Sequence, residues 1–416
     1  MSSTADPGWW KRPRTIVLPV LPPELWIEIF EFATYVPGAV QSQSYNPFET
    51  IVPLPQLEEL RSLKIAYRTK RSLVLVCKRW RELATPILYR IVLADHTKGV
   101  ERLHRTLVSD FQSSSVVGSL RACVRRLVCV TLSSGVPFDL LAEIIRSIPT
   151  LVIFNLWPAK YRGINLVIPE NIRLSLATQG ESLRVLDWAP GYVDAAALHE
   201  WRQMVSSLPG LRILRYWHGM ALPPGTSFTP VRLPNLIYSS WDSIGLSRGR
   251  NSGRLTAEDD LRALQSLEFR DHLPPVPPHI GHNITLLSVP VSPCGIRGQI
   301  PELLAMLPNL VHLVLRADDW PIIPQALPLP RIQKLGLGRF TGQACKNRDY
   351  TVLFDNLFSI DAPQLRVVRF VGWDEWSALS HRGPRVLARF RELAPSRPFR
   401  VEDREGRLLT DLWGLN

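Results

Sequence analysis

Residues 300–315, IPELLAMLPNLVHLVL, contain the pattern that decides the fold. The first half has apolar residues at helical spacing and ends at Pro308, which cannot continue a helix. The second half carries Leu310, Leu313 and Leu315 among β-branched neighbours, as is typical of a short strand. A helix, a proline stop and a short strand together make one repeat unit.

Related stretches recur from residue 124 to residue 370, each with three apolar residues spaced as L-x-x-L-x-L. One copy, around Ser239, is degenerate. The middle residues of the triplets are Leu127, Phe154, Leu186, Leu214, Ser239, Leu267, Leu287, Leu313, Leu335 and Val368. Their mean spacing is about 27 residues, which lies within the range of leucine-rich repeats.

A proline two residues before the triplet strengthens this pattern. It occurs at Pro149, Pro209, Pro234, Pro308, Pro330 and Pro363. Composition alone would give only about two such matches in this region. We therefore expect a mixed α/β fold, with an irregular leucine-rich-repeat solenoid of short parallel strands, shaped as a horseshoe, over residues 120–375. The alternative is a doubly wound α/β fold, and the absence of a Gly-rich turn after a strand counts against it.

Two stretches of the first hundred residues predict helices. In LPPELWIEIFEFA (21–33), Leu25, Ile29 and Phe32 share one helical face, and the two prolines suit a first turn. In LVLVCKRW (73–80), apolar residues also recur at helical spacing. We expect Pro86 to stop or kink this second helix, with a strand at 87–93.

Together these stretches resemble the F-box, a helical motif that begins L-P-x-E-L and ends near V-C-K-x-W. Here the two signatures are Leu21 to Leu25 and Val76 to Trp80. The resemblance covers about residues 18–93. The segment between the signatures, an insertion at about 34–70, is longer than usual by about twenty residues, which costs little in a loop. With this insertion the sequence especially resembles the F-box proteins of mushroom-forming fungi, which often carry such an insert.

The resemblance implies docking on the small acidic adaptor subunit of cullin-RING ubiquitin ligases. The residues it assigns to adaptor binding are Leu21, Pro22, Pro23, Leu25, Ile29, Leu73 and Val76. The residues it assigns to packing within the F-box are Phe30, Cys77 and Trp80. Apolar arcs this wide favour an interface, although both helices could instead pack under the following domain.

For the rest of the chain we expect a flexible leader (1–17), a connector (94–119) and a C-terminal cap (376–416). Tryptophans that follow or close a strand pattern are candidates for a target-binding row along one rim of the solenoid, unless they fill the core. They are Trp157, Trp188, Trp217, Trp241, Trp320 and Trp373.

The net charge of +12 suits an acidic protein partner or nucleic acid, with residues 121–126 and 247–254 as basic candidates. Five cysteines without a C-x-x-C pair favour a reducing compartment, and no signal-peptide core or membrane-length apolar run occurs, so we expect a cytoplasmic or nuclear protein. No catalytic or metal-binding motif is found, so we expect no enzyme activity and no cofactor.

From the F-box resemblance and the repeats, we expect a substrate-recognition subunit of an SCF-type ubiquitin ligase with a protein target. The alternatives are a repeat-based protein-binding scaffold without a ligase role and, less favoured, a nucleic-acid-binding protein. Steep salt dependence would distinguish the last of these.

Overall fold

The computed structural model of the chain describes residues 21–42, 46–49, 56–108, 120–131, 137–158, 169–188, 195–216, 230–241, 258–269, 276–291, 299–317, 319–323, 325, 327–339, 347–372, 384–393 and 398–412. Its centre is a parallel sheet of twelve strands, in which each strand pairs with its neighbours in sequence. The strands are β1 (Ile91–Ala94), β2 (Arg126–Thr131), β3 (Ile153–Pro158), β4 (Val185–Trp188), β5 (Ile213–Tyr216), β6 (Tyr238–Trp241), β7 (Ser266–Phe269), β8 (Leu286–Val291), β9 (His312–Ala317), β10 (Lys334–Arg339), β11 (Val367–Phe370) and β12 (Arg400–Glu402).

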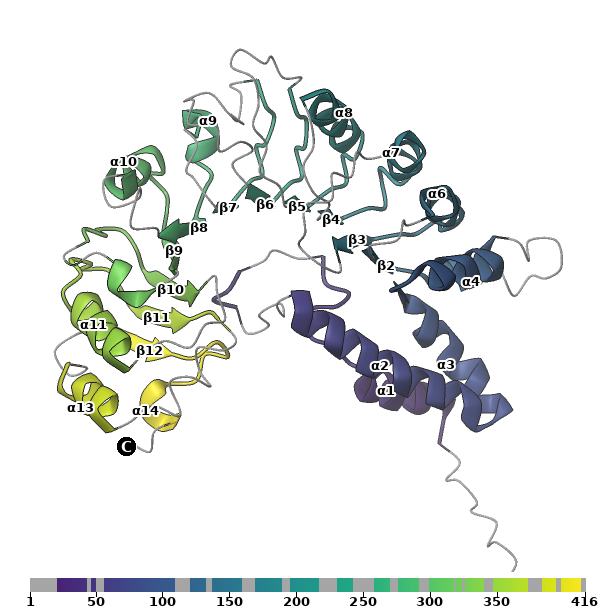
Figure 1. The fold of residues 1–416 in the computed structure, drawn as a ribbon, viewed down its shortest axis with the longest axis horizontal. Helices are drawn as coiled ribbons and strands as arrows, with labels where there is room; N and C mark the ends of the chain where they lie inside the picture. The colour runs from purple at the N-terminus through teal and green to yellow at the C-terminus, as the bar shows by residue number, and fades with distance from the viewer. Residues whose placement is uncertain are drawn as a thin grey trace, which may run out of the picture.

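The sheet bends into an arc, with strands on the inside and a row of helices on the outside (Figure 1). The outer helices are α4 (Thr97–Leu107), α6 (Phe138–Ser147), α7 (Glu170–Ala177), α8 (Ala195–Ser206), α9 (Pro278–Gly281), α10 (Gln299–Met306), η2 (Trp320–Ile322), α11 (Asn347–Phe358), α13 (Pro384–Leu393) and α14 (Leu409–Leu412). The mixed α/β class is therefore confirmed. A doubly wound sheet reverses its strand order at one point, and the described strands show no such reversal.

The predicted repeat positions coincide with one row of the sheet. All the triplet middle residues from Leu127 to Val368 are register partners of one another across β2 to β11. They are buried, and all but Ser239 belong to the large apolar cluster between strands and outer helices. Burying a leucine contributes roughly 1.5–3 kcal/mol, so this row is a main source of stability.

The sheet extends beyond the predicted limits at both ends. At one end β1 lies just before the expected connector and α4 lies within it, and Val100, Leu103 and Leu107 of α4 are buried in the main apolar cluster. At the other end, β12 pairs with β11 in parallel, and Glu402 also forms an antiparallel bridge with Leu408. The described part of the predicted cap therefore adds one more parallel strand to the sheet. The predicted leader lies outside the described residues.

Three helices precede the sheet: α1 (Pro23–Ala33), α2 (Gln56–Val76) and α3 (Lys78–Arg90). The expected single helix across residues 73–84 is wrong, because the chain breaks at Cys77. This residue has extended backbone (φ −159°, ψ 171°), and its Sγ accepts a hydrogen bond from the N–H of Trp80 at 3.4 Å. The thiol thus caps the N-terminus of α3, in the way that a serine side chain does.

Pro86 lies inside α3, so the expectation that it stops the helix is wrong. A proline in a helix interior costs about 3 kcal/mol. Burial of Ala84 and Ile87 against Trp26 and Phe30 offsets this cost, because both α3 residues lie in that apolar cluster. The helix therefore continues to Arg90, and the predicted strand shortens to β1.

The insertion lies on the inner face of the sheet, which is the face turned away from the outer helices. Val36 and Ala39, together with Leu63 and Ala66 of α2, form an apolar cluster with Val128, Val130 and Trp157 of the sheet. In Figure 1, α2 lies within the arc, and the described residues 46–49 reach toward β10 on its opposite arm. The insertion therefore ties the N-terminal helices to the sheet at two places.

Candidate functional site

The two F-box-like signatures meet around an aromatic cluster. The ring of Trp80 lies 5.0 Å from that of Trp26 and 4.8 Å from that of Phe30. Nη2 of Arg79 donates to the carbonyl of Leu21 at 3.3 Å, which places the start of α1 beside the start of α3. Phe30 and Trp80 therefore pack together. The expected packing of Cys77 is wrong, because its side chain is exposed.

Large apolar side chains remain exposed around this cluster. On α1 these are Leu25 (43% exposed), Ile29 (45%) and Phe32 (86%), and at the end of α2 they are Leu75 (71%) and Val76 (54%). We call these five residues the N-terminal apolar surface. Trp26 and Phe30 of the same helix are buried against α3, so α1 is packed on one face while Leu25, Ile29 and Phe32 stay exposed on the other. Large exposed apolar patches are typical of interaction sites, so these residues are the candidate docking surface of the chain.

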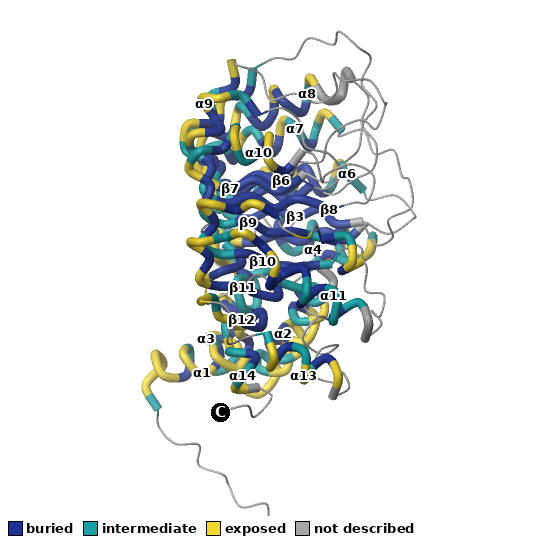
Figure 2. Tube along the Cα trace, turned by 90° about the vertical axis from the view of Figure 1, so that its left-hand side faces the viewer, coloured by how far each residue is buried: buried dark blue, intermediate teal, exposed yellow. Residues whose placement is uncertain are grey.

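Of the residues predicted to bind the adaptor, Pro22, Pro23, Leu25, Ile29 and Val76 are exposed. Leu21 and Leu73 are half-buried and pack against the Trp26 cluster. The F-box resemblance did not assign Phe32 and Leu75 to adaptor binding, although Phe32 lies on the same helical face as Leu25 and Ile29. Figure 2 shows that α1 to α3 are among the most exposed parts of the chain, whereas the strands are buried.

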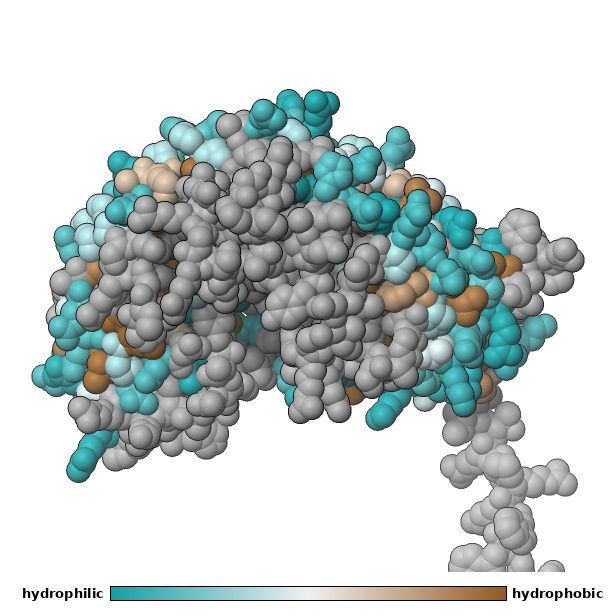
Figure 3. Space-filling model, turned by 45° about the horizontal axis from the view of Figure 1, so that its top comes forward, coloured by the Kyte–Doolittle hydropathy of each residue, from teal (hydrophilic) through white to brown (hydrophobic). Residues whose placement is uncertain are grey.

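Cations border the N-terminal apolar surface. Lys78, Arg79 and Arg81 are exposed at the start of α3, directly after Val76. Elsewhere, the face shown in Figure 3 is largely hydrophilic along the outer helices, and its apolar residues form small separate patches. Glu24 and Glu28 are also exposed beside Leu25 and Ile29, so the charges around this surface are mixed, and the cations at the start of α3 form the part that suits an acidic partner.

The inner face of the sheet carries a buried chain of paired polar groups. Asp187 accepts a hydrogen bond from Trp157 Nε1 at 2.9 Å and lies 3.8 Å from Arg215. Further along, Glu268 accepts a hydrogen bond from the Tyr238 hydroxyl and pairs with Arg316, at 2.5 and 2.6 Å. Buried charges persist only when they are paired in this way.

Arg126 connects this chain to α2. Its side chain is 3% exposed and donates to Glu59 at 2.6 Å, to Asn155 at 2.8 Å and to the carbonyl of Ala39 at 2.9 Å. Its guanidinium also lies 5.7 Å from the ring centroid of Trp157. Since these partners come from α2, β3 and the insertion, Arg126 is the main polar link between the N-terminal helices and the sheet.

The predicted tryptophan row is wrong for the residues that can be located. Trp188 and Trp320 are buried in the main core, between strands and outer helices. Trp157 faces the inner side of the sheet, but α2 and the insertion cover it. Trp241 ends β6 and its side chain lies outside the described residues, as do Trp217 and Trp373 entirely.

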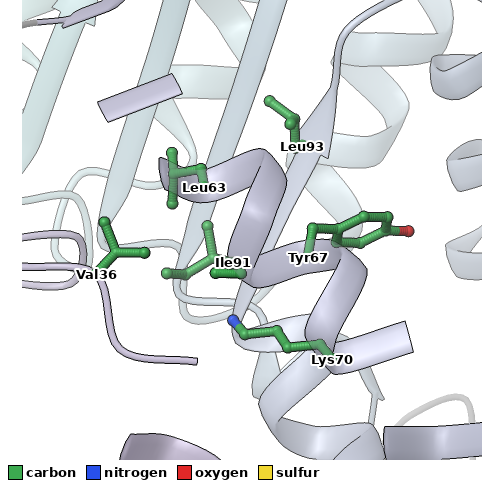
Figure 4. A pocket seen from close by; sticks show the side chains of 7 residues that line it. Val36, Leu63, Tyr67, Lys70, Ile91 and Leu93 are labelled. Carbon is green, nitrogen blue, oxygen red and sulfur yellow. The ribbon is translucent and has the colours of Figure 1, made fainter. Parts of the chain in front are cut away.

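A small pocket opens beside α2 and β1, lined by Val36, Leu63, Tyr67, Ile91 and Lys70 among others (Figure 4). Desolvation, aided by the nearby Arg90, lowers the pKa of Lys70 to about 8, whereas Glu31 opposes the shift. The polar groups of its lining residues are the buried Lys70 amine and the hydroxyl of Tyr67, and the walls are otherwise apolar.

Nucleophiles and basic stretches give no reactive arrangement in the described part of the chain. Burial raises the pKa of the Cys129 thiol to about 12, which makes it inert. No group of three or more His, Cys, Asp and Glu side chains that could hold a metal occurs among the described residues. Arg121 donates to the carbonyls of Leu107 and Val108, and residues 247–254 lie outside the described chain.

None of the helices in the described chain is both long and apolar enough to cross a membrane. No protein-family model matches the sequence, and no curated protein matches it.

Proposed function

We propose that the chain is a non-catalytic substrate-recognition subunit of a cullin-RING ubiquitin ligase of the SCF type. In this proposal α1, the end of α2 and α3 form an F-box that docks on the acidic adaptor. The strands and outer helices form an irregular leucine-rich-repeat solenoid that binds a protein target. The proposal implies a protein of the cytoplasm, the nucleus or both, without a cofactor.

The observation that carries the proposal is the N-terminal apolar surface. Leu25, Ile29 and Val76 are among the residues that the F-box resemblance assigns to adaptor binding, and they are exposed although apolar. Trp26, Phe30 and Trp80 provide the internal support that holds them in place. Exposed cations at the start of α3 complement an acidic partner.

The fixed link between the two parts also supports the proposal. A ligase must hold its target at a set distance from the transferring enzyme, because transfer depends on positioning. Here α2 packs on the inner face of the sheet and Arg126 pairs with Glu59 of that helix. The N-terminal helices therefore cannot swing freely relative to the strands that would hold the target.

The test is equilibrium binding of the purified chain to the acidic adaptor of a cullin-RING ligase. Leu25→Asp combined with Val76→Asp should weaken binding by about 100-fold, since both residues lie in the predicted interface. Leu174→Asp is the matched control, because Leu174 is 61% exposed on α7. Undiminished binding by the double variant, or equal loss in the control, would rule out this docking surface.

A scaffold without a ligase role is the second candidate, and one observation favours it. The insertion and α2 bury Val128, Val130 and Trp157 on the inner face, as a cap for one end of a repeat array would. In that case the chain binds no adaptor, and the aspartate substitutions change nothing but solubility. The same binding experiment therefore decides between the two candidates.

A further inference from the structure

The inner face of β8 to β11 holds the side chain of Phe48, from the insertion. The ring is 6% exposed and lies against Leu286 and Val314, with Val371 packed beside them. The imidazole of His312 lies 5.3 Å from it, centroid to centroid. A single phenylalanine is thus enclosed by strands that follow it by more than two hundred residues in the sequence.

Two cations face this ring. Lys334 Nζ lies 5.8 Å and Arg369 Cζ lies 5.9 Å from the ring centroid, which is within the range of cation–π attraction. Glu402 holds Arg369 in place, by accepting from Nε at 3.0 Å and from Nη2 at 2.6 Å. Nη1 then donates to the carbonyls of Pro47 and Glu49, at 3.3 and 3.5 Å. The site thus contacts both an aromatic side chain and the backbone around it.

The floor of the site depends on two glycines of β10. A Cβ added at Gly336 would lie 2.9 Å from Val314 Cγ2 and 3.2 Å from Val371 Cγ1, and one at Gly338 would lie 3.0 Å from Val371 Cγ2. The valines therefore lean over β10, where other strands carry an inner-face side chain. Glycine within a strand often marks a place where another chain approaches closely.

The seated segment presents its aromatic ring from a compact turn. The N–H of Phe48 donates to Asn46 Oδ1 at 3.0 Å, and the N–H of Glu49 donates to the Asn46 carbonyl at 3.1 Å. Among the described residues, this segment contacts the sheet through the Phe48 ring and accepts two long hydrogen bonds from Arg369, and Pro47 beside the ring is also buried. Tethering, which keeps the segment at a high effective concentration, therefore favours its occupancy more than extensive contacts do.

A further polar group beside the site is unused. Ser288, the register partner of Val314, is buried, and its hydroxyl has no hydrogen-bond partner among the described residues. A ligand with one more polar group than residues 46–49 could bond to it. The site therefore suits a peptide of this kind, and residues 46–49 leave its Ser288 hydroxyl without a hydrogen bond.

We propose that these strands form a peptide-binding site for a phenylalanine in a tight turn of a partner protein, and that residues 46–49 occupy it as an internal competitor. Calling that partner a ligase target rests on the proposed function, whereas the binding itself does not. A partner segment with the same chemistry displaces residues 46–49. Binding of the partner segment therefore removes the contacts between the insertion and β8 to β11.

The test uses a fluorescent peptide with the sequence of residues 43–52, QSYNPFETIV, and the full chain. Phe48→Ala, which vacates the site, should bind it saturably, and the unchanged chain should bind it about ten-fold or more weakly. A peptide with alanine in place of its phenylalanine should not bind. Lys334→Ala in the Phe48→Ala chain should weaken binding, whereas Lys98→Ala, an exposed lysine on α4, should not.

Absence of saturable binding by folded Phe48→Ala, or equal binding by the unchanged chain, would overturn the proposal. Equal binding of the alanine peptide would do the same. If Phe48→Ala does not fold, Phe48→Leu keeps apolar volume, loses the cation–π contacts and should still bind better than the unchanged chain. Adaptor binding, measured on the same protein, separates the two proposals, because Leu25 and Val76 lie on the N-terminal helices.

Discussion

Replacing Arg126 by methionine tests the link between the N-terminal helices and the sheet. The substitution keeps most of the apolar stem but removes the partner of Glu59, whose carboxylate is buried in the same place. It also removes donors to Asn155 and to the Ala39 carbonyl. Leaving a buried carboxylate without its partner costs about 3–5 kcal/mol, so we expect a loss of this size in the free energy of unfolding.

The measurement is urea unfolding of the purified chain, followed by circular dichroism. Glu59→Met combined with Arg126→Met should recover most of the loss, since an apolar pair of similar volume can replace a buried ion pair. Arg125→Met, at the exposed neighbouring position, should change stability by less than about 0.5 kcal/mol. A loss below about 1 kcal/mol for Arg126→Met, or no recovery in the double variant, would refute the assigned role of this pair.

Three further predictions concern titrating groups. Desolvation and Lys334 lower the pKa of His312 from 6.5 to about 4, so the free energy of unfolding falls as pH drops between these values. His312→Gln should remove about 1–2 kcal/mol of that fall, measured by urea unfolding at pH 7 and pH 4. Burial lowers the pKa of Lys70 from 10.5 to about 8, so Lys70→Met should raise stability at pH 7 by about 1–2 kcal/mol and abolish the rise between pH 8 and 10.5. Iodoacetamide should alkylate exposed Cys77 and spare Cys129 in the folded chain, as mass spectrometry would report.

Each of these three predictions has an outcome that would contradict it. A His312→Gln chain with an unchanged acid dependence would show that the imidazole beside Phe48 is not desolvated. A less stable Lys70→Met chain would mean that Glu31 outweighs burial. Alkylation of Cys129 at the rate of Cys77 would mean that β2 is open to solvent.

The strand row was predictable because its signal is local. Residues such as Leu313 and Leu335 occupy the same place in each L-x-x-L-x-L triplet and face the outer helices, so the triplet pattern alone places them in one row. The same logic shows why the tryptophan prediction failed. Trp188 is two residues after Leu186 and therefore shares its buried face, whereas Trp157 directly follows Leu156 and faces the other side.

The insertion's contacts were not predictable from local patterns. Arg126 and Glu59 are 67 residues apart, and Arg369 meets the carbonyl of Pro47 across 322 residues, so no periodicity connects them. The break at Cys77 was also hidden, because the residue sits at helical spacing and thiols are not among the preferred capping groups. Sequence thus indicated the exposed residues of α1, but not how the chain between the two signatures returns to the sheet.

Hydrogen exchange of the full chain, with and without the purified acidic adaptor, tests the central proposal most directly. Docking through the N-terminal apolar surface predicts slower exchange in α1 and across the α2–α3 junction, while α7 on the outer row stays unchanged. Unaltered exchange at residues 23–33 and 73–80 in the presence of saturating adaptor, or protection confined to the outer helices, would contradict it.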